Sequence, residues 1–528
     1  METLLWLAAS VAGTVSLIPN NNAWSLPAFK TFLAIFCTVF ALRKAYWLWV
    51  YPYWVSPLRR LPGPTDHHFL IGQILNQFLS GNPNEPYLSW MRKWPDADMI
   101  RYFTFGNSEA ILVTGLDVCR EILSAKTYSF VKPAVHEKLL RPIVGKGLLF
   151  TEGEEHKAQR RLMAGPFSLT KLKSLIPVFQ QKSQQLSDYF DRQIASQNGI
   201  VELSSTYSSL TLDIIGVAAL GADLQNLDAP TPFHECYHRV FEPPLLGQAL
   251  LVINAYIPVR WIPVKENRQF KSANSEVQRL TREIVRQRIK DVTGREGGGA
   301  VGNTNRRDLL TYIVEETYAT DHPWSEDEIL GHMLNMIAAG HETTASALLW
   351  ATYALVKFPD VQQRLRSEIL ALLEEAPIPS YSEIERPKYL DSFCKEVLRV
   401  WCPAISTPRE AAEDVVIKGV HVPKGTTLML MPAVIHLNPR IWGEDAHIFN
   451  PDRWERKPLD PHAFAPFIQG PRQCIGRVFS MLEFKAVLIE MVAKFCFEAV
   501  DGTDNIVLVN PSPLLRPKGG FHVRVRRY

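Results

Sequence analysis

Hydrophobic and polar positions divide the chain into an apolar N-terminal segment and a long body of mixed pattern. Leu4 to Ile18 and Phe29 to Leu42 are almost uninterrupted apolar runs, each shorter than the roughly 20 residues of a membrane-spanning helix. The span Trp24 to Leu42 is long enough if the Lys30 side chain extends to the membrane surface. Tryptophan and tyrosine cluster after this span, as they do at a membrane interface. We therefore expect residues 1–55 to form a hydrophobic anchor of one or two segments.

Two other interpretations of the N-terminus stay open. A cleaved signal peptide would explain the apolar runs, although the basic region that normally precedes its apolar segment is missing. A buried pair of N-terminal helices would also explain runs as short as these. Basic residues follow the second run, which favours an uncleaved anchor with the body of the protein on the cytosolic side. These residues are Arg43, Lys44, Arg59 and Arg60.

The pattern after the anchor predicts a body of helices with small sheets. A Leu-Pro-Gly-Pro sequence within residues 56–66 cannot continue a helix and predicts a stiff hinge. Residues 99–114 alternate as in a strand, and most of residues 116–290 have the pattern of amphipathic helices. Residues 293–307 contain three consecutive glycines and predict a flexible surface loop. We expect residues 67–528 to form one mainly α domain with small β sheets.

One predicted helix is long enough to cross the whole domain. Ser325 and Glu328 form a capping-box pattern, and Pro359 follows the last periodic residue. About 34 residues lie between these signals, which is about 50 Å of helix at 1.5 Å per residue. The middle of this helix contains a glycine and two threonines, which are poor helix formers. A threonine hydroxyl can bond the carbonyl one turn back and open the helix locally.

Composition and charge exclude some classes of function. The 528 residues are 46% apolar and 21% charged, which is typical of a globular protein. The net charge of +3 is too small to indicate nucleic-acid binding. The seven cysteines are odd in number, scattered and without metal-ligand spacing, so they indicate a reducing compartment and no disulfide framework.

The segment with the most chemical information is FIQGPRQCIG, which contains Cys474. A cysteine thiolate can be the fifth ligand of a haem iron and pushes electron density that favours oxygen cleavage. Gly470 and Gly476 allow a flat ligand to approach the backbone, whose N–H groups can hydrogen-bond the sulfur. Arg472 offers a cation to an acidic edge of the ligand, and Phe467 can pack beside the sulfur. The alternative is that Cys474 is a small buried hydrophobic residue.

The spacing F-x-x-G-x-R-x-C-x-G resembles the haem-binding loop of the cytochrome P-450 family. Other motifs of this family follow in the family's order along nearly the whole chain. The resemblance implies a single haem-thiolate domain with the cytochrome P-450 fold, in which one long helix runs over the distal face of the haem. It also implies heme b (iron protoporphyrin IX) as the cofactor, with Cys474 as the axial ligand.

The middle of the long helix, AAGHETT, resembles the oxygen-activation motif A/G-G-x-E/D-T of the family. The resemblance implies that Gly340 leaves room for the haem. It implies that Glu342 brings in protons by way of water and that Thr343 hydrogen-bonds dioxygen or its water. A strained core helix with a solvated glutamate is the alternative. We do not expect His341 to be a metal ligand, because a thiolate is already in place.

Two further motifs imply a buried ion network near the thiolate. Glu396 and Arg399 match the E-x-x-R motif of the family, and Arg453 in FNPDRW matches its later arginine. Three such charges can satisfy one another where one alone could not. Trp454 stands where the family more often has phenylalanine. The alternative for Glu396 and Arg399 is a surface pair of little energetic value.

Four residues match positions that bind the haem propionates in the family. Arg472 precedes Cys474 by two residues, and Arg409 precedes a predicted strand pair. His156 and Arg160 match W-x-x-x-R with histidine in place of tryptophan, and a histidine can still donate an N–H. A solvated helix face is the alternative for the segment that contains His156 and Arg160.

By resemblance, three regions should line the substrate pocket, namely residues 127–150, 404–407 and 511–515. We see no charged anchor in them, which favours a bulky apolar substrate such as a terpenoid, a polyketide or a fatty acyl chain. Residues 241–264 are apolar and interrupted by prolines. This segment either dips into the bilayer or packs in the core.

The resemblance implies a monooxygenase that inserts one oxygen atom of O2 into a C–H bond or an alkene. Electrons would come from NADPH through a separate NADPH-cytochrome P-450 reductase, with cytochrome b5 as a second candidate donor. The reductase should dock near Cys474 through residues such as Arg472 and Arg477. The enzyme would lie in the endoplasmic reticulum membrane with its catalytic domain in the cytosol. Two rival functions are a haem-thiolate isomerase or dehydratase that needs neither O2 nor reductase, and a non-catalytic haem-binding sensor or carrier.

Overall fold

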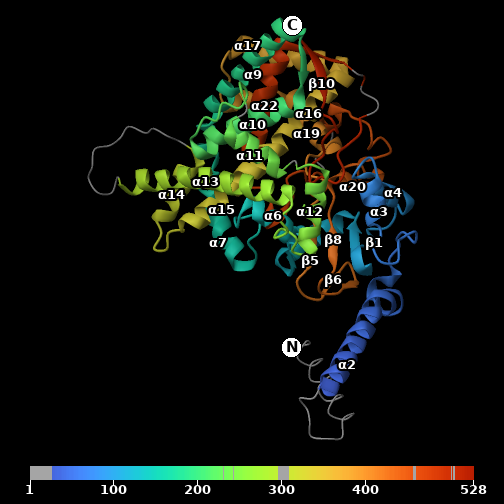
Figure 1. The fold of residues 1–528 in the computed structure, drawn as a ribbon. Helices are drawn as coiled ribbons and strands as arrows, with labels where there is room; N and C mark the ends of the chain where they lie inside the picture. Colours follow the sequence, from blue (N-terminus) through green and yellow to red (C-terminus); the bar gives the residue numbers. More distant parts are fainter. Residues whose placement is uncertain are drawn as a thin grey trace.

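The computed structural model describes residues 26–229, 231–241, 243–294, 308–455, 460–500, 502 and 506–528. The first apolar run, Leu4 to Ile18, lies outside these residues, as does most of the loop expected at 293–307. The body is mainly helical with three small sheets, as the sequence predicts (Figure 1).

The α-helices are α2 (Leu26–Ala45), α3 (Ile74–Leu79), α4 (Glu85–Lys93), α5 (Leu116–Arg120), α6 (Ala134–Val144), α7 (Gly153–Ala164), α8 (Leu169–Lys173), α9 (Ile176–Gln197), α10 (Leu203–Ile215), α11 (Pro232–Phe241), α12 (Leu245–Tyr256), α13 (Lys265–Thr293), α14 (Leu309–Tyr318), α15 (Glu326–Gly340), α16 (Glu342–Lys357), α17 (Pro359–Glu375), α18 (Tyr381–Glu385), α19 (Lys388–Val400), α20 (Pro432–His436), α21 (Pro439–Trp442) and α22 (Arg477–Lys494). The strands are β1 (Met99–Phe103), β2 (Glu109–Val113), β3 (Phe130–Val131), β4 (Ile200–Glu202), β5 (Arg409–Ala411), β6 (Val415–Ile417), β7 (Val420–Val422), β8 (Thr427–Met429), β9 (Phe495–Ala499) and β10 (His522–Arg527).

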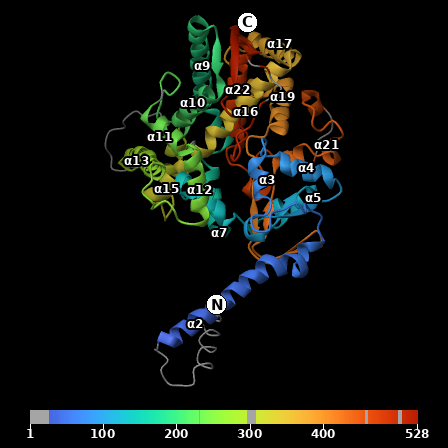
Figure 2. The same ribbon diagram turned by 45° about the vertical axis from the view of Figure 1, so that its right-hand side comes forward.

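The N-terminal helix projects away from the body, next to the sheet that holds β1 and β8 (Figures 1 and 2). Helix α2 continues into a π-helical segment, Tyr46–Val55. Together they give an apolar stretch of 27 residues, Phe29–Val55, which is not buried in the body. The alternative of a buried helix pair is therefore wrong for this run. Its length and composition are compatible with a membrane anchor. A second apolar stretch, Leu203–Leu220, is mostly buried and belongs to the core.

The predicted hinge packs tightly against the first sheet. The backbone N–H of Arg101 donates to the carbonyl of Pro62 over 2.8 Å. A Cβ atom on Gly63 would overlap the Arg101 carbonyl oxygen, so only glycine allows the chain to pass this close. The Ser56 hydroxyl donates to Glu109 over 2.8 Å. These contacts fix the hinge to the β1–β2 hairpin.

The sheets join segments that are far apart in the sequence. The largest has five strands in the order β1-β2-β8-β5-β3, and a second has the order β4-β10-β9, while β6 pairs with β7. The alternating residues 99–114 form the antiparallel hairpin β1–β2, with Phe105–Asn107 as its turn. Pairing of β3 with β5 aligns Val131 with Glu410 and so brings residues 130–132 beside Arg409.

The long central helix is broken into two helices. The expected capping box at Ser325 is present, and Pro359 begins the next helix, but α15 ends at Gly340 and α16 begins at Glu342. The Thr343 hydroxyl donates to the carbonyl of Ala339 over 2.7 Å, and the Thr344 hydroxyl donates to that of Gly340 over 3.2 Å. The expectation of one continuous helix is therefore wrong. These side-chain bonds compete with the helical backbone bonds at the break.

The core lies where α10, α19 and α22 pack on this pair of helices, near the centre of Figure 1. Residues of α16 from Thr344 to Leu355 are all buried. All seven cysteines are free, in agreement with the expected absence of a disulfide framework.

Candidate functional site

The Cys474 loop is held by the backbone that surrounds it. The Cys474 N–H donates to the Phe467 carbonyl over 2.8 Å, and α22 begins at Arg477, directly after the loop. Gly470 has a φ of 79°, and a Cβ atom there would overlap the Leu123 carbonyl oxygen. Gly470 is therefore required for the loop to pack on residue 123, which is a different reason from the predicted approach of a ligand. A Cβ atom on Gly476 would lie 3.8 Å from Cys474 Sγ, an ordinary contact.

The Cys474 thiol is accessible although protein surrounds it. Its side chain has exposed surface, yet burial raises the pKa of the thiol. The Gly476 backbone hydrogen bond and the Arg160 charge act in the opposite direction on this pKa. Both observations hold if the thiol faces a space inside the protein, where a ligand could reach the sulfur. A bound cation or metal would stabilise the thiolate form there.

Helices α15 and α16 are largely buried, but residues near the break between them have accessible surface. Ala339 is exposed although residues 329–337 and 344–355 of these helices are buried. Thr343 and Gly340 are half-buried. A Cβ atom on Gly340 would lie 2.8 Å from Ile215 Cδ1, so a larger residue here would have to displace the end of the Ile215 side chain on α10. Helix α16 in turn packs on α22, the helix that follows the Cys474 loop.

Glu342 and His341 are in direct polar contact, which the sequence analysis missed. His341 Nε2 lies 2.9 Å from Glu342 Oε1, and the Ser208 hydroxyl donates to the same oxygen over 3.3 Å. Burial would raise the pKa of Glu342, but His341, Arg516 and Ser208 outweigh it and lower this pKa to about 2. Neighbouring residues do not face each other on a regular helix, so this pair forms because the helix breaks at His341. The sequence signal was the run of poor helix formers on both sides of the histidine.

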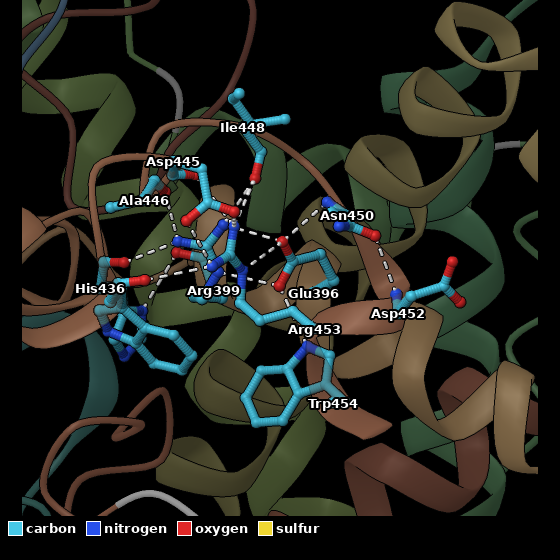
Figure 3. A network of polar contacts seen from close by, with 11 residues as sticks. Glu396, Arg399, His436, Asp445, Ala446, Ile448, Asn450, Asp452, Arg453 and Trp454 are labelled. Atoms are coloured by element: carbon cyan, nitrogen blue, oxygen red, sulfur yellow. Dashed lines mark hydrogen bonds and ion pairs between the residues drawn. The ribbon is translucent and has the colours of Figure 1, made fainter. Parts of the chain in front are cut away.

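A second group of charges, which we call the carboxylate network, consists of Glu396, Arg399 and Arg453 (Figure 3). Arg399 is 0% exposed and binds Glu396 with two hydrogen bonds of 2.8 Å. Arg453 Nε lies 3.5 Å from Glu396 Oε1. The predicted contacts between these residues are therefore present, and the alternative of a surface pair is wrong. The Trp454 indole N–H donates to Glu396 over 3.0 Å, a bond that phenylalanine could not make.

His436 connects this network with the chain that leads to Cys474. Its Nδ1 lies 3.2 Å from the Arg399 carbonyl, and its Nε2 accepts a hydrogen bond of 3.1 Å from the Ala465 N–H (Figure 3 shows His436). Burial and the Arg399 charge lower the pKa of His436 to about 3, so the ring is neutral. The neutral ring donates through Nδ1 and accepts through Nε2, and it thereby fixes Ala465 relative to Arg399.

The predicted propionate ligands form a third group, which we call the cationic cluster. It contains the four predicted residues and one that the sequence analysis missed. The members are Lys132, His156, Arg160, Arg409 and Arg472. Lys132 is the residue that was missed. It belongs to the cluster because β3 pairs with β5, and no local pattern indicates this contact between segments about 280 residues apart.

The cationic cluster has more positive charge than its partners can balance. Glu152 forms an ion pair with Arg472 and lies 4.0 Å from Lys132 Nζ. Burial and Arg409 lower the pKa of Lys132 to about 7. Burial and Arg472 lower the pKa of His156 to about 4 and that of Arg409 to about 10. The buried Arg472 Nε has no hydrogen-bond partner among the residues that the structure describes.

These residues fit a haem. A haem has a flat body that needs an accessible thiolate and two carboxylates that need cations. The accessible Cys474 thiol and the unbalanced cationic cluster offer both, and the two are adjacent in the chain because Arg472 precedes Cys474 by two residues. His156 Nδ1 lies 3.2 Å from the Tyr128 hydroxyl and is buried, so the alternative of a solvated helix face is wrong for His156.

Two of the three expected pocket regions lie together. Ala404 pairs with Leu514 in an isolated bridge, and the Leu515 carbonyl accepts hydrogen bonds of 2.8 Å from Ser346 and Trp350 of α16. The third region contains Lys132. This lysine belongs to the cationic cluster.

The chain was compared with known proteins. A family model described as Cytochrome P450 matches residues 61–525. The Cytochrome P450 monooxygenase sphH of Aspergillus fumigatus is 32% identical over 510 residues, which cover 92% of each chain. The Cytochrome P450 monooxygenase FUM15 of Gibberella moniliformis is 30% identical and covers 90% of this chain and 89% of its own. The Cytochrome P450 monooxygenase FSL4 of Gibberella zeae is 28% identical and covers 99% and 98%.

Proposed function

The chain belongs to the cytochrome P450 family, and from this premise we propose that it oxidises a lipophilic small molecule with O2 and with electrons from NADPH. The electrons arrive through a separate NADPH-cytochrome P450 reductase, with cytochrome b5 as a second candidate donor. The observation that carries this proposal is the accessible Cys474 thiol beside an unbalanced cationic cluster.

The residues of the chain have distinct parts in this proposal. Cys474 binds the haem iron, while the cationic cluster binds the propionates. When bound, the haem supplies the redox chemistry that activates dioxygen. The carboxylate network holds the loop at a fixed position through His436 and Ala465. At the break between α15 and α16, the Thr343 hydroxyl and the Glu342 carboxylate hold and move protons. Oxygen cleavage needs such protons at a site from which bulk water is excluded.

The substrate is a bulky apolar molecule such as a terpenoid, a polyketide or a fatty acyl chain. Two of the regions expected to line the substrate pocket, residues 404–407 and 511–515, pair with each other. The second is hydrogen-bonded to α16 through Leu515, so both regions can line one pocket beside this helix. Phe467 packs against the core beside the Cys474 loop. Metabolite profiling after deletion of the gene identifies the class, since a missing oxidised product and an accumulated precursor differ by one oxygen atom.

A spectrum of the reduced protein with carbon monoxide tests the haem-thiolate assignment. We expect the red-shifted Soret band of thiolate ligation in the wild-type protein and its loss in Cys474→Ser. A histidine-type band in the wild-type protein would contradict the proposal. Oxidation of a substrate extract with reductase, NADPH and isotopically labelled dioxygen then tests the reaction. One labelled oxygen atom in the product supports it.

Two rival functions make different predictions in the same assay. A haem-thiolate isomerase or dehydratase would convert its peroxide substrate without NADPH, reductase or O2. A non-catalytic sensor or carrier would bind haem and oxidise no NADPH with the reductase present. The pair of Glu342 and Thr343 favours the monooxygenase, since neither rival needs proton delivery.

The membrane proposal has support from a second exposed apolar region. Leu246, Ile253, Tyr256 and Ile257 of α12 and the following turn are exposed, and Trp261 is 75% exposed. The core-packing alternative is therefore wrong for these side chains. The Tyr256 ring lies 5.7 Å from that of Phe105, in the hairpin that contacts the N-terminal helix through Asn107 and Leu48. The N-terminal helix and α12 enter the same face of the endoplasmic reticulum membrane, with the body in the cytosol.

Carbonate extraction of a microsomal fraction tests the anchor. We expect the full chain to stay in the pellet. Release into the supernatant would contradict the membrane proposal and leave the haem-thiolate assignment untouched.

The reductase docks on the surface nearest Cys474. Arg477 is exposed at the start of α22 and can therefore contact the reductase. The expectation that Arg472 also contacts the reductase is wrong, because its side chain is 4% exposed and forms an ion pair with Glu152. Charge reversal at Arg477 should slow electron transfer from the reductase more at low salt than at high salt.

A further inference from the structure

The environment of His341 determines where its protons are. Its ring is 1% exposed and lies edge-on to the Tyr237 ring at 4.7 Å. Nδ1 lies 3.1 Å from the Ile337 carbonyl oxygen, which can only accept a hydrogen bond. Nδ1 must therefore carry a proton. The other nitrogen, Nε2, is then left to interact with Glu342.

The contact between His341 and Glu342 requires one more proton. Nε2 lies 2.9 Å from Glu342 Oε1, and without a proton between them a nitrogen lone pair would face a carboxylate oxygen in a buried site. With one proton the pair is either imidazolium with carboxylate or imidazole with carboxylic acid. In both forms the two side chains together hold one proton that can leave.

Other groups around the pair do not supply this proton. The Ser208 hydroxyl of α10 donates to Glu342, and Arg516 contributes a positive charge. The Tyr237 hydroxyl of α11 is buried without a hydrogen-bond partner among the described residues, and burial together with Glu342 keeps its pKa well above the usual value. Glu342 is 18% exposed and His341 is 1% exposed, so protons enter and leave the pair through Glu342.

We propose that His341 is a positioning residue that stores the proton which Glu342 delivers toward Thr343. This inference rests on the proposed function and adds to it a residue and a source of protons. The proton moves from His341 Nε2 to Glu342 Oε1 and then to the acceptor beside Thr343. His341 is left neutral with its proton on Nδ1, and a proton from solvent returns through Glu342. A carboxylate alone would be unprotonated at neutral pH, whereas the His341 ring has a second nitrogen that can hold the proton which Glu342 passes on.

The substitution His341→Gln separates hydrogen bonding from proton storage. A glutamine amide can donate to Glu342 but cannot take up a proton. His332→Gln is the matched control, because His332 is also buried on α15 but its pKa is lowered to about 4 by burial. His332 stacks on Trp324, and its Nε2 has no hydrogen-bond partner among the described residues.

The first measurement needs no catalysis. Infrared difference spectra of haem-loaded full-length protein with isotopically labelled histidine are recorded from about pH 5 to about pH 9. We expect an imidazolium transition in the wild type and in His332→Gln that is missing in His341→Gln. If His341→Gln keeps every transition of the wild type, His341 does not store a proton and the proposal is overturned.

The second measurement follows NADPH oxidation with the reductase and without added substrate. We expect His341→Gln to raise the share of electrons recovered as hydrogen peroxide at least about threefold, because proton delivery becomes limiting. This share should rise with pH in the wild type and lose its pH dependence in the variant. A peroxide share and pH profile equal to those of His332→Gln would overturn the proposal. If the haem protein shows no thiolate spectrum, the proposed function fails, while the infrared titration still reports on the pair.

Discussion

The carboxylate network and the cationic cluster are two buried groups of charges that differ in one respect. The charges of the network are paired with each other, whereas the cluster has an excess of basic side chains. In the network, Arg399 pairs with Glu396 and Arg453 pairs with Asp445, so each guanidinium has a carboxylate partner. Backbone carbonyls of His436 and Ile448 accept further hydrogen bonds from Arg399. In the cluster, five basic side chains lie around Glu152, and the pKa values of Lys132 and His156 are lowered. A balanced buried group needs no ligand to satisfy its charges, whereas an unbalanced one is complete only when a ligand of opposite charge is bound.

The largest effect should follow when the network is broken. Arg399→Ala removes both short ion-pair hydrogen bonds of the buried Glu396 carboxylate and leaves Arg453, at 3.5 Å, as its nearest cation, which costs about 3–5 kcal/mol of the free energy of unfolding. We expect the protein to lose haem incorporation and not merely to turn over more slowly. The carbon monoxide spectrum and the haem-to-protein ratio measure this.

The control for this prediction is Arg386→Ala, which removes an exposed ion pair of 2.6 Å with Glu375. Such a pair contributes about 0–1 kcal/mol, so haem loading should stay as in the wild type. Full haem loading in Arg399→Ala would show that the network does not hold the Cys474 loop.

Removing a charge from the cationic cluster should have the opposite effect on the ligand-free protein. Arg409→Met takes away a buried cation, so the haem-free protein should be as stable as the wild type or more stable. Haem affinity should fall about 10- to 100-fold, because a hydrogen bond to a charged group contributes about 1.5–3 kcal/mol. Haem transfer to an acceptor protein measures the affinity, and thermal unfolding measures the stability. Loss of stability without loss of affinity would refute the difference between the two groups.

The pH dependence of stability should also distinguish the two groups. Folding lowers the pKa of Lys132 from 10.5 to about 7, so the unfolded chain binds more protons between these values. The stability of the haem-free protein should therefore rise from about pH 7 toward alkaline pH. Bound propionates would raise this pKa again and remove the slope. Thermal unfolding of haem-free Lys132→Met should show a smaller slope than the wild type, and an equal slope would exclude Lys132 as its cause.

The smallest effect should come from Trp454, an uncharged residue that contacts the carboxylate network. Trp454→Phe removes an indole N–H that donates to Glu396 and should cost about 1 kcal/mol. Trp442→Phe is the control, because its buried indole nitrogen has no partner among the described residues. Urea unfolding should show a loss for Trp454→Phe that exceeds the loss for Trp442→Phe. Equal losses would mean that the hydrogen bond to Glu396 contributes nothing.

Several parts of the site could be predicted because their signals are local. The capping box at Ser325 and the poor helix formers around His341 are short patterns that act on neighbouring backbone. The pairing of Glu396 with Arg399 needs only the three-residue spacing of one helix. The prediction of a single long helix was wrong. The sequence indicated that threonine hydroxyls could bond backbone carbonyls, but not that the helix would end at Gly340 and start again at Glu342.

Local sequence patterns were enough to predict the cytochrome P450 family and its mainly α fold, since the residues around Cys474, the long apolar run and the helix signals each act within a few turns of chain. Tertiary structure alone decided the charge balance of the site. Lys132 joins Arg409 only because two strands pair, and His341 contacts Glu342 at the junction where α15 ends and α16 begins. The physical reason is that a pKa and a buried charge depend on every group within a few ångströms, and those groups come from distant segments.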